Sequence, residues 1–214
     1  SFWDYEQRGI VANIRTEQPH NGVARQVFLP TGPLALLPTP NPHIVSIVWS
    51  ADEPLAVQLL NETPERFAKQ VETESGRVLG ACECVSDIKA FPLRMQYARQ
   101  WFHQRIVLAG DAAHTIHPLA GQGANLGFGD VNELCEQLQG VDLKALNDLT
   151  KHLSAYQRAR KADTQVMIAA MELFKRGFGT ANPVVKGLRA LAFAIPNKFT
   201  PLKRKLAEVA LGSN

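Results

Sequence analysis

The sequence is poor in cysteine and contains no long apolar run, and each shortage excludes a class of protein. Its three cysteines, Cys82, Cys84 and Cys135, are an odd set without the spacing of a zinc site. A disulfide framework is therefore not expected, and a reducing cytosol fits better. No apolar run approaches the roughly 18 residues that a membrane-spanning helix needs. Because no secretory signal opens the chain either, the expected location is cytoplasmic.

A glycine motif for binding the ADP part of a dinucleotide is also missing. Glycines two residues apart occur only at 121/123, 127/129 and 177/179, and none of these pairs lies in a βαβ unit. A chain of 214 residues with 45% hydrophobic content can still bury a substantial core. A ligand site in this chain therefore has to be built on a different motif.

Residues 105–130 carry such a motif. A short apolar run at 106–108 predicts a buried strand that ends at Gly110 and Asp111. A loop containing Pro118 follows, and then the glycines at 121 and 123 begin a predicted helix. The expected apolar face of this helix carries Gly127, Val131, Leu134 and Leu138, whereas Asp130, Glu133, Glu136 and Gln137 fall elsewhere.

This arrangement predicts a ligand before any family is considered. A carboxylate at the C-terminal end of a strand is well placed to accept hydrogen bonds from ligand hydroxyls. A helix start without bulky side chains exposes backbone N–H groups, and its dipole favours negative charge by about 0.3 to 1 kcal/mol per site. We therefore expect a polyol at Asp111 and an anion at residues 121–125.

The same stretch resembles the second flavin fingerprint of the aromatic-ring hydroxylases, the flavoprotein monooxygenases built like p-hydroxybenzoate hydroxylase. The matching positions are Gly110, Asp111, His114, Pro118, Gly121, Gln122, Gly123, Asn125, Gly127 and Asp130. Residues 91–93 (FPL), 19–28 (PHNGVARQVF) and 46–50 (SIVWS) are similar to the ubiquinone-biosynthesis hydroxylases. The last two segments point to the VisC type, the 2-polyprenylphenol hydroxylase.

The resemblance implies an α+β fold in three parts. Residues 1–92 would be the β-rich substrate-binding domain, with an antiparallel sheet of the p-hydroxybenzoate hydroxylase type. Residues 93–140 would be the C-terminal part of the FAD-binding domain, and residues 141–214 a helical region. In the family an ADP-binding unit precedes this point of the chain, so we expect the chain to be a C-terminal fragment with absent or weak FAD binding and no turnover of its own.

The resemblance also implies roles for the fingerprint residues. Asp111 would bind the ribityl chain of FAD, and Pro118 would stand beside the reactive edge of the isoalloxazine. Backbone N–H groups of residues 121–125 would face its N1 and C2 carbonyl, where reduced flavin is anionic. The expected cofactor-binding residues are thus Asp111, Pro118, Gly121, Gln122, Gly123, Ala124 and Asn125. The sequence identifies no catalytic acid or base.

The implied activity is hydroxylation of the ring of a polyprenylated phenol in ubiquinone biosynthesis, with O2 and through a flavin C4a-hydroperoxide. An electron donor such as NAD(P)H and other ubiquinone-synthesis proteins would be the partners. Two alternatives stay open. The chain is a lipid-binding or scaffolding subunit of a quinone-synthesis assembly, or it belongs to a ring hydroxylase for another aromatic substrate.

His114 and His117 have the spacing of a metal-binding helix, but Pro118 follows at once and the only nearby carboxylate is Asp111. We therefore expect no metal. His114 remains either a polar loop residue or a proton relay.

Strands are expected at 10–14, 23–29, 34–37, 44–49 and 78–88. Asn21-Gly22 is a strong hairpin signal, and the short connections predict an antiparallel meander. A helix is expected to begin at Thr63 as N-cap, with Pro64 at its first position. Cys82 and Cys84 would be small core residues on one face of a strand.

Helices dominate the rest of the chain. A stripe of apolar residues predicts one long helix from about 146 to 176, followed by shorter helices near 184–195 and 202–209. From Lys175 onward eight basic residues face one acidic residue, Glu208. These helices either pack on the flavin domain with solvated lysines or lie on an anionic membrane surface, which would place the protein at the periphery of the inner membrane. No motif for nucleic acid accompanies the charge.

Overall fold

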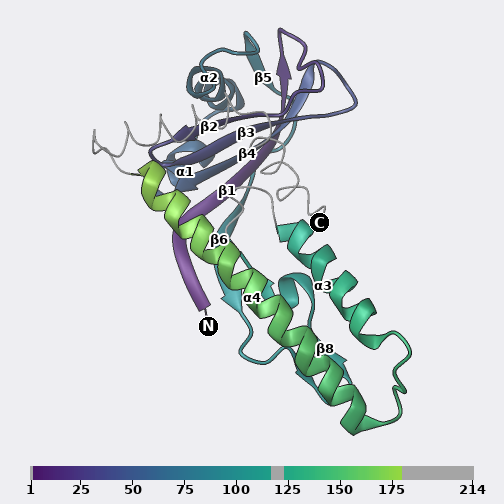
Figure 1. Ribbon diagram of the computed structural model, residues 1–214. Helices are drawn as coiled ribbons and strands as arrows, with labels where there is room; N and C mark the ends of the chain where they lie inside the picture. Colours follow the sequence, from purple (N-terminus) through teal and green to yellow (C-terminus); the bar gives the residue numbers. More distant parts are fainter. Residues whose placement is uncertain (1, 117–122, 180–214) are drawn as a thin grey trace, which may run out of the picture. The chain divides into compact units, whose positions relative to one another are not determined.

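The computed structural model describes residues 2–116 and 123–179 (Figure 1). The chain divides into two compact units, Asp4–Leu93, and Arg94–Asn214 together with Ser1–Trp3. Antiparallel strands and separate helices make up these units, so the expected α+β class is confirmed. The division into three functional domains stays a prediction.

The first unit is built on an antiparallel sheet. Its strands are β1 (Phe2–Thr16), β2 (Arg25–Leu29), β3 (Gly32–Pro38) and β4 (Ile44–Asp52), in the order β2-β3-β4-β1 (Figure 1). β1 pairs with β4, with Ile10 opposite Trp49, and β2 pairs with β3. The expected antiparallel meander is therefore confirmed for β2, β3 and β4 and wrong for β1, which pairs with β4 and not with β2.

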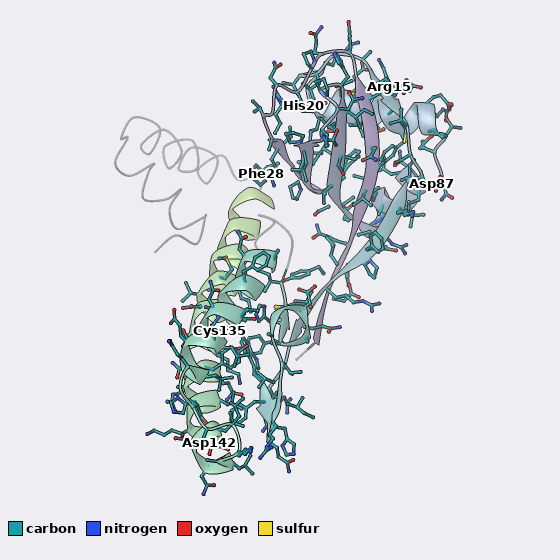
Figure 2. The ribbon with its side chains drawn as sticks, turned by 90° about the vertical axis from the view of Figure 1, so that its right-hand side faces the viewer. Arg15, His20, Phe28, Asp87, Cys135 and Asp142 are labelled. Carbon is teal, nitrogen blue, oxygen red and sulfur yellow. The ribbon has the colours of Figure 1, made fainter. Side chains whose placement is uncertain are left out.

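The turn at Asn21-Gly22 explains the difference. Both residues have positive φ, 54° and 70°, so the predicted tight turn does form. However, His20 next to it is buried and faces the β3–β4 connection: its backbone N–H donates to the carbonyl of Pro42, and its Nε2 lies 3.0 Å from the carbonyl of Asn41 (Figure 2). The turn therefore reverses the chain without pairing the strands on either side of it.

One face of this sheet and two helices enclose the apolar core. β4 alternates between buried and partly buried residues, as a strand with one covered face should. The helices are α1 (Glu53–Leu60) and α2 (Pro64–Glu74). The largest core side chains from these elements are Ile10, Ile14, Leu34, Leu36, Ile47, Trp49, Leu59 and Phe67.

Capping side chains begin both helices. The Asp52 carboxylate accepts from the N–H of Leu55 at the start of α1, a helix that the sequence analysis missed. The Thr63 hydroxyl accepts from the N–H of Arg66, and Phe67 is buried on the inner face of α2. The predicted start of α2 is therefore confirmed.

The strand expected at 78–88 is shorter than predicted. Only β5 (Cys82–Cys84) forms, paired with β1, because Arg77 and Gly80 have positive φ and bend the chain before it. Cys82 and Cys84 pack against the core, as predicted. Burial raises the pKa of the Cys82 thiol to about 11, so this thiol stays protonated at neutral pH.

The second unit combines short strands with two helices. β6 (Lys89–Tyr97) leads into it, followed by β7 (Phe102–His103), β8 (Ile106–Val107), the 3-10 turn η1 (Gly110–Ala112) and β9 (His114–Thr115). The helices are α3 (Gly123–Leu138) and α4 (Leu146–Gly179), which lie side by side (Figure 1). The single long helix predicted after residue 146 is confirmed. The helices expected beyond residue 180 lie outside the described residues.

The strand before Asp111 is not the buried strand that the sequence predicts. β8 has two residues and pairs only with β7 in the described part of the chain, and Ile106 is 69% exposed. A two-stranded ribbon leaves its outer face to solvent, which accounts for this exposure. None of the helices in the described residues has an apolar stretch long enough to cross a bilayer.

Candidate functional site

The turn that carries Asp111 packs directly on α3. A Cβ placed on Gly127 would lie 3.4 Å from the Cα of Gly110, so the two backbones are in contact. Gly110 also has a φ of 57°, a conformation that favours glycine. The fingerprint glycines at 110 and 127 therefore bring the carboxylate-bearing turn against the helix.

Asp111 itself is exposed at the surface of this turn. Its backbone carbonyl accepts from the Thr115 hydroxyl at 3.2 Å, and within the described residues its carboxylate makes no hydrogen bond. Among the predicted cofactor residues, Gly123, Ala124 and Asn125 form the first turn of α3. No described atom lies within 4 Å of a Cβ built on Gly123. Pro118, Gly121 and Gln122 lie outside the described residues.

An exposed carboxylate and an uncrowded helix start are the features that a flavin needs at its ribityl chain and ring edge. The carboxylate can accept hydrogen bonds from hydroxyls, and the first N–H groups of an α-helix have no partners within the helix. The two features stand on segments that contact one another. Asp111 and the start of α3 therefore have the chemistry that the ring end of FAD would require, and their role as cofactor-binding residues stays a prediction.

Asp130 of α3 is a buried carboxylate that binds three other residues of this unit. The sequence analysis had placed it away from the apolar face of the helix. Its side chain is fully buried. Its Oδ2 accepts from the backbone N–H of Gly110 at 2.8 Å and from Nε2 of His114 at 2.7 Å, and its Oδ1 accepts from Nε of Arg160 at 2.7 Å. The prediction was wrong because periodicity alone does not show that a carboxylate has partners to meet inside the protein.

The buried carboxyl of Asp130 keeps its negative charge. Burial on its own raises the pKa of the carboxyl, but the hydrogen bonds from His114, Arg160 and Gly110 outweigh it and hold the pKa below its usual range. Asp130 is therefore ionised at neutral pH. Because an ionised carboxylate only accepts hydrogen bonds, Nε2 of His114 must carry a proton.

His114 is buried, with 1% of its surface exposed, and its ring lies on Trp101 with centroids 5.1 Å apart. Its other nitrogen, Nδ1, is buried and has no hydrogen-bond partner in the described part of the chain. His114 lies in β9 rather than in a loop. Among the described residues no His, Cys, Asp and Glu side chains gather as metal ligands would, and His117 lies outside them.

Arg160 of α4 completes the network, and the sequence analysis did not single it out. Its Nη2 donates to the carbonyl of Leu126 at 3.3 Å, and its Nη1 to the carboxylate of Asp163 at 2.5 Å. A Cβ on Gly129 would stand 2.9 Å from Nη2, so the arginine lies across this glycine. The sequence did contain a signal for Arg160: it lies four residues after Tyr156 and so falls on the buried face of α4, where a charged residue needs a partner.

Tyr156 ties the same segment to α4 at a second point. Its hydroxyl donates to the carbonyl of Leu108 at 2.9 Å, and its ring contacts Trp101. Burial, and after it the nearby charge of Asp130, raises the pKa of this hydroxyl, so it remains a donor at neutral pH. Residues 108–110 are therefore held from α3 by Asp130 and from α4 by Tyr156.

Comparison with known proteins agrees with the flavin fingerprint. The model of a family described as an FAD binding domain matches residues 5–170. The chain belongs to this FAD-binding family. FAD is thus the cofactor of the family, and the resemblance to ubiquinone-biosynthesis hydroxylases is confirmed by the relatives.

Three relatives illustrate that resemblance. The ubiquinone biosynthesis monooxygenase COQ6 of Xenopus tropicalis is 34% identical over 97% of this chain and 52% of its own length. The ubiquinone hydroxylase UbiL of Rhodospirillum rubrum is 34% identical over 98% of this chain and 49% of its own length. The 3-demethoxyubiquinol 3-hydroxylase of Escherichia coli is 34% identical over 98% of this chain and 54% of its own length. The chain spans about half the length of the curated relatives it matches.

Solved structures share the fold. The p-nitrophenol 4-monooxygenase PnpA of Pseudomonas putida has a TM-score of 0.71 at 18% identity, over 100% of this chain and 56% of its own. PqsL of Pseudomonas aeruginosa, described as a probable FAD-dependent monooxygenase, has a TM-score of 0.69 at 20% identity, over 84% of this chain and 50% of its own. These identities support the fold and not a substrate.

Proposed function

We propose that this chain works in an FAD-dependent monooxygenase that hydroxylates the ring of a polyprenylated phenol during ubiquinone biosynthesis. The observation that carries the proposal is the contact between the Asp111 turn and α3 in a chain of the FAD-binding family. The substrate class comes from relatives named for ubiquinone biosynthesis. The VisC type remains the finer prediction.

In this proposal the second unit holds the ring end of FAD. Asp111 accepts hydrogen bonds from the ribityl hydroxyls, and backbone N–H groups of residues 121–125 face the N1 and C2 carbonyl edge. The positive end of α3 stabilises negative charge there. Pro118 is proposed to stand beside the reactive edge.

FAD, when bound, supplies the redox chemistry that transfers one oxygen atom of O2 to the ring, with electrons from a donor such as NAD(P)H. The chain's own contribution is to bind and orient. The sheet of the first unit is proposed to bind the phenol and to keep water from it. No side chain of the described residues is assigned as the acid or base.

The test is Asp111→Ala in the full-length natural protein. A hydrogen bond to a charged group contributes about 1.5 to 3 kcal/mol, so we expect FAD binding to weaken by about ten- to a hundredfold. Asp142→Ala is the matched control, because Asp142 is an exposed carboxylate in the loop between α3 and α4, at the other end of α3 (Figure 2). Unchanged flavin content in the Asp111 variant would refute the assigned role.

No observation in the described residues favours the scaffold alternative over the enzyme. Vesicle flotation combined with a turnover assay separates the two proposals. A scaffold should bind prenyl lipid in vesicles without flavin and show no hydroxylation, whereas the proposed enzyme should hydroxylate its phenol only when FAD is bound.

A further inference from the structure

The proposed flavin cradle has two halves that come from different parts of the chain. One is the turn with Asp111, and the other is the first turn of α3. A carboxylate and a helix start can share one ligand only if their separation is fixed, since small displacements weaken hydrogen bonds steeply. Some part of the protein must therefore set this separation.

One carboxylate reaches towards both halves. Oδ2 of Asp130 accepts from the N–H of Gly110, the residue directly before Asp111. Oδ1 accepts from Arg160, whose Nη2 in turn donates to the carbonyl of Leu126 in the first turn of α3. Both halves of the cradle are thus connected through the Asp130–Arg160 pair.

His114 fixes the half that carries Asp111. It donates to the same oxygen of Asp130 that accepts from Gly110, and its ring is held against Trp101. A histidine here leaves Nδ1 buried without a partner in the described residues, which costs stability. The hydrogen bond from Nε2 to the buried carboxylate offsets that cost. Because Gly110 donates to the same oxygen, this hydrogen bond also orients Oδ2 towards Gly110.

We propose that His114, Asp130 and Arg160 are positioning residues for the flavin, and that His114 acts specifically through the placement of Asp111. The inference rests on the proposed function of Asp111. It adds that flavin affinity depends on residues that make no contact with the cofactor. It also gives the three buried polar side chains of this network a role in cofactor binding in addition to their role in stability.

A double-mutant cycle in the full-length natural protein tests the inference, with FAD affinity as the readout. His114→Phe keeps an aromatic ring beside Trp101 but removes the donor to Asp130. We expect about tenfold weaker FAD binding in the natural background and a change of at most about twofold in the Asp111→Ala background. His114→Gln, which keeps an N–H donor, should recover part of the affinity. His103→Gln, at an exposed histidine of β7, is the control and should change nothing.

Each outcome has a distinct meaning. If Asp111→Ala leaves FAD affinity unchanged, the proposed function fails. If Asp111→Ala weakens binding but His114→Phe has the same effect in both backgrounds, or no effect, the positioning role is overturned while the proposed function stands. Should His114→Phe fail to fold, Arg160→Lys replaces it, since it keeps a positive charge near Asp130 but cannot keep the hydrogen bonds to both Asp130 and Leu126. The same non-additivity with Asp111→Ala is expected there, and additivity would overturn the inference.

Discussion

The interior of each of the two units is stabilised by a different kind of interaction. The first buries aliphatic and aromatic side chains between a sheet and two helices, and the sequence pattern places most of them correctly. The second has an aromatic cluster around Trp101 and, beside it, a buried carboxylate with an arginine and a histidine. Apolar burial needs only a face, whereas a buried charge needs specific partners. The flavin fingerprint lies in the unit of the second kind.

The largest effect is expected from breaking the buried network. Asp130→Ala leaves Arg160 buried without its main partner, and such losses cost about 3 to 5 kcal/mol. Denaturant unfolding followed by circular dichroism should report this loss as a lower free energy of unfolding. Asp163→Ala is the matched control: Asp163 also binds Arg160 but is 63% exposed, so we expect at most about 1 kcal/mol. Equal losses in the two variants would contradict the comparison.

In the first unit the corresponding change is Leu36→Ala. Leu36 is fully buried, and removing such a side chain costs about 2 to 5 kcal/mol because it leaves a cavity. Its neighbour Leu37 is 39% exposed on the other face of β3 and provides the control, for which a clearly smaller loss is expected. Equilibrium unfolding of both variants measures the difference. A Leu37→Ala loss as large as that of Leu36→Ala would show that this face is also covered.

The smallest and most specific effect is expected in how steeply stability changes with pH, separate from the overall loss of stability that a change at Asp130 causes. The pKa of Asp130 is lowered in the folded state, so its contribution to stability is fully present above the unfolded-state value of about 4 and is lost as the pH falls through the folded value. Asp130→Asn should therefore flatten the acid limb of the stability profile. The free energy of unfolding, measured across this pH range for both proteins, tests the expectation. If it falls equally steeply towards acid pH in both, the pKa of Asp130 is not lowered in the folded state.

Much of the fold followed from local signals. The turn at Asn21-Gly22, the Thr63 cap, the alternation in β4 and the length of α4 are each set by residues within a few positions of one another. The buried strand before Asp111 was not predicted correctly, because β8 depends on what covers it rather than on its own apolar residues.

The sequence by itself determined the fingerprint, and with it the family, because the fingerprint depends on residue types at fixed spacing. Only the tertiary structure decided that β1 pairs with β4, that Asp130 is buried, and that Arg160 reaches it across 30 residues of sequence. The physical reason is the same in each case. A buried charge or a central strand is stable only when its hydrogen-bond partners are in place. In each of these cases the partner lies far away along the chain, so local sequence patterns do not reveal it.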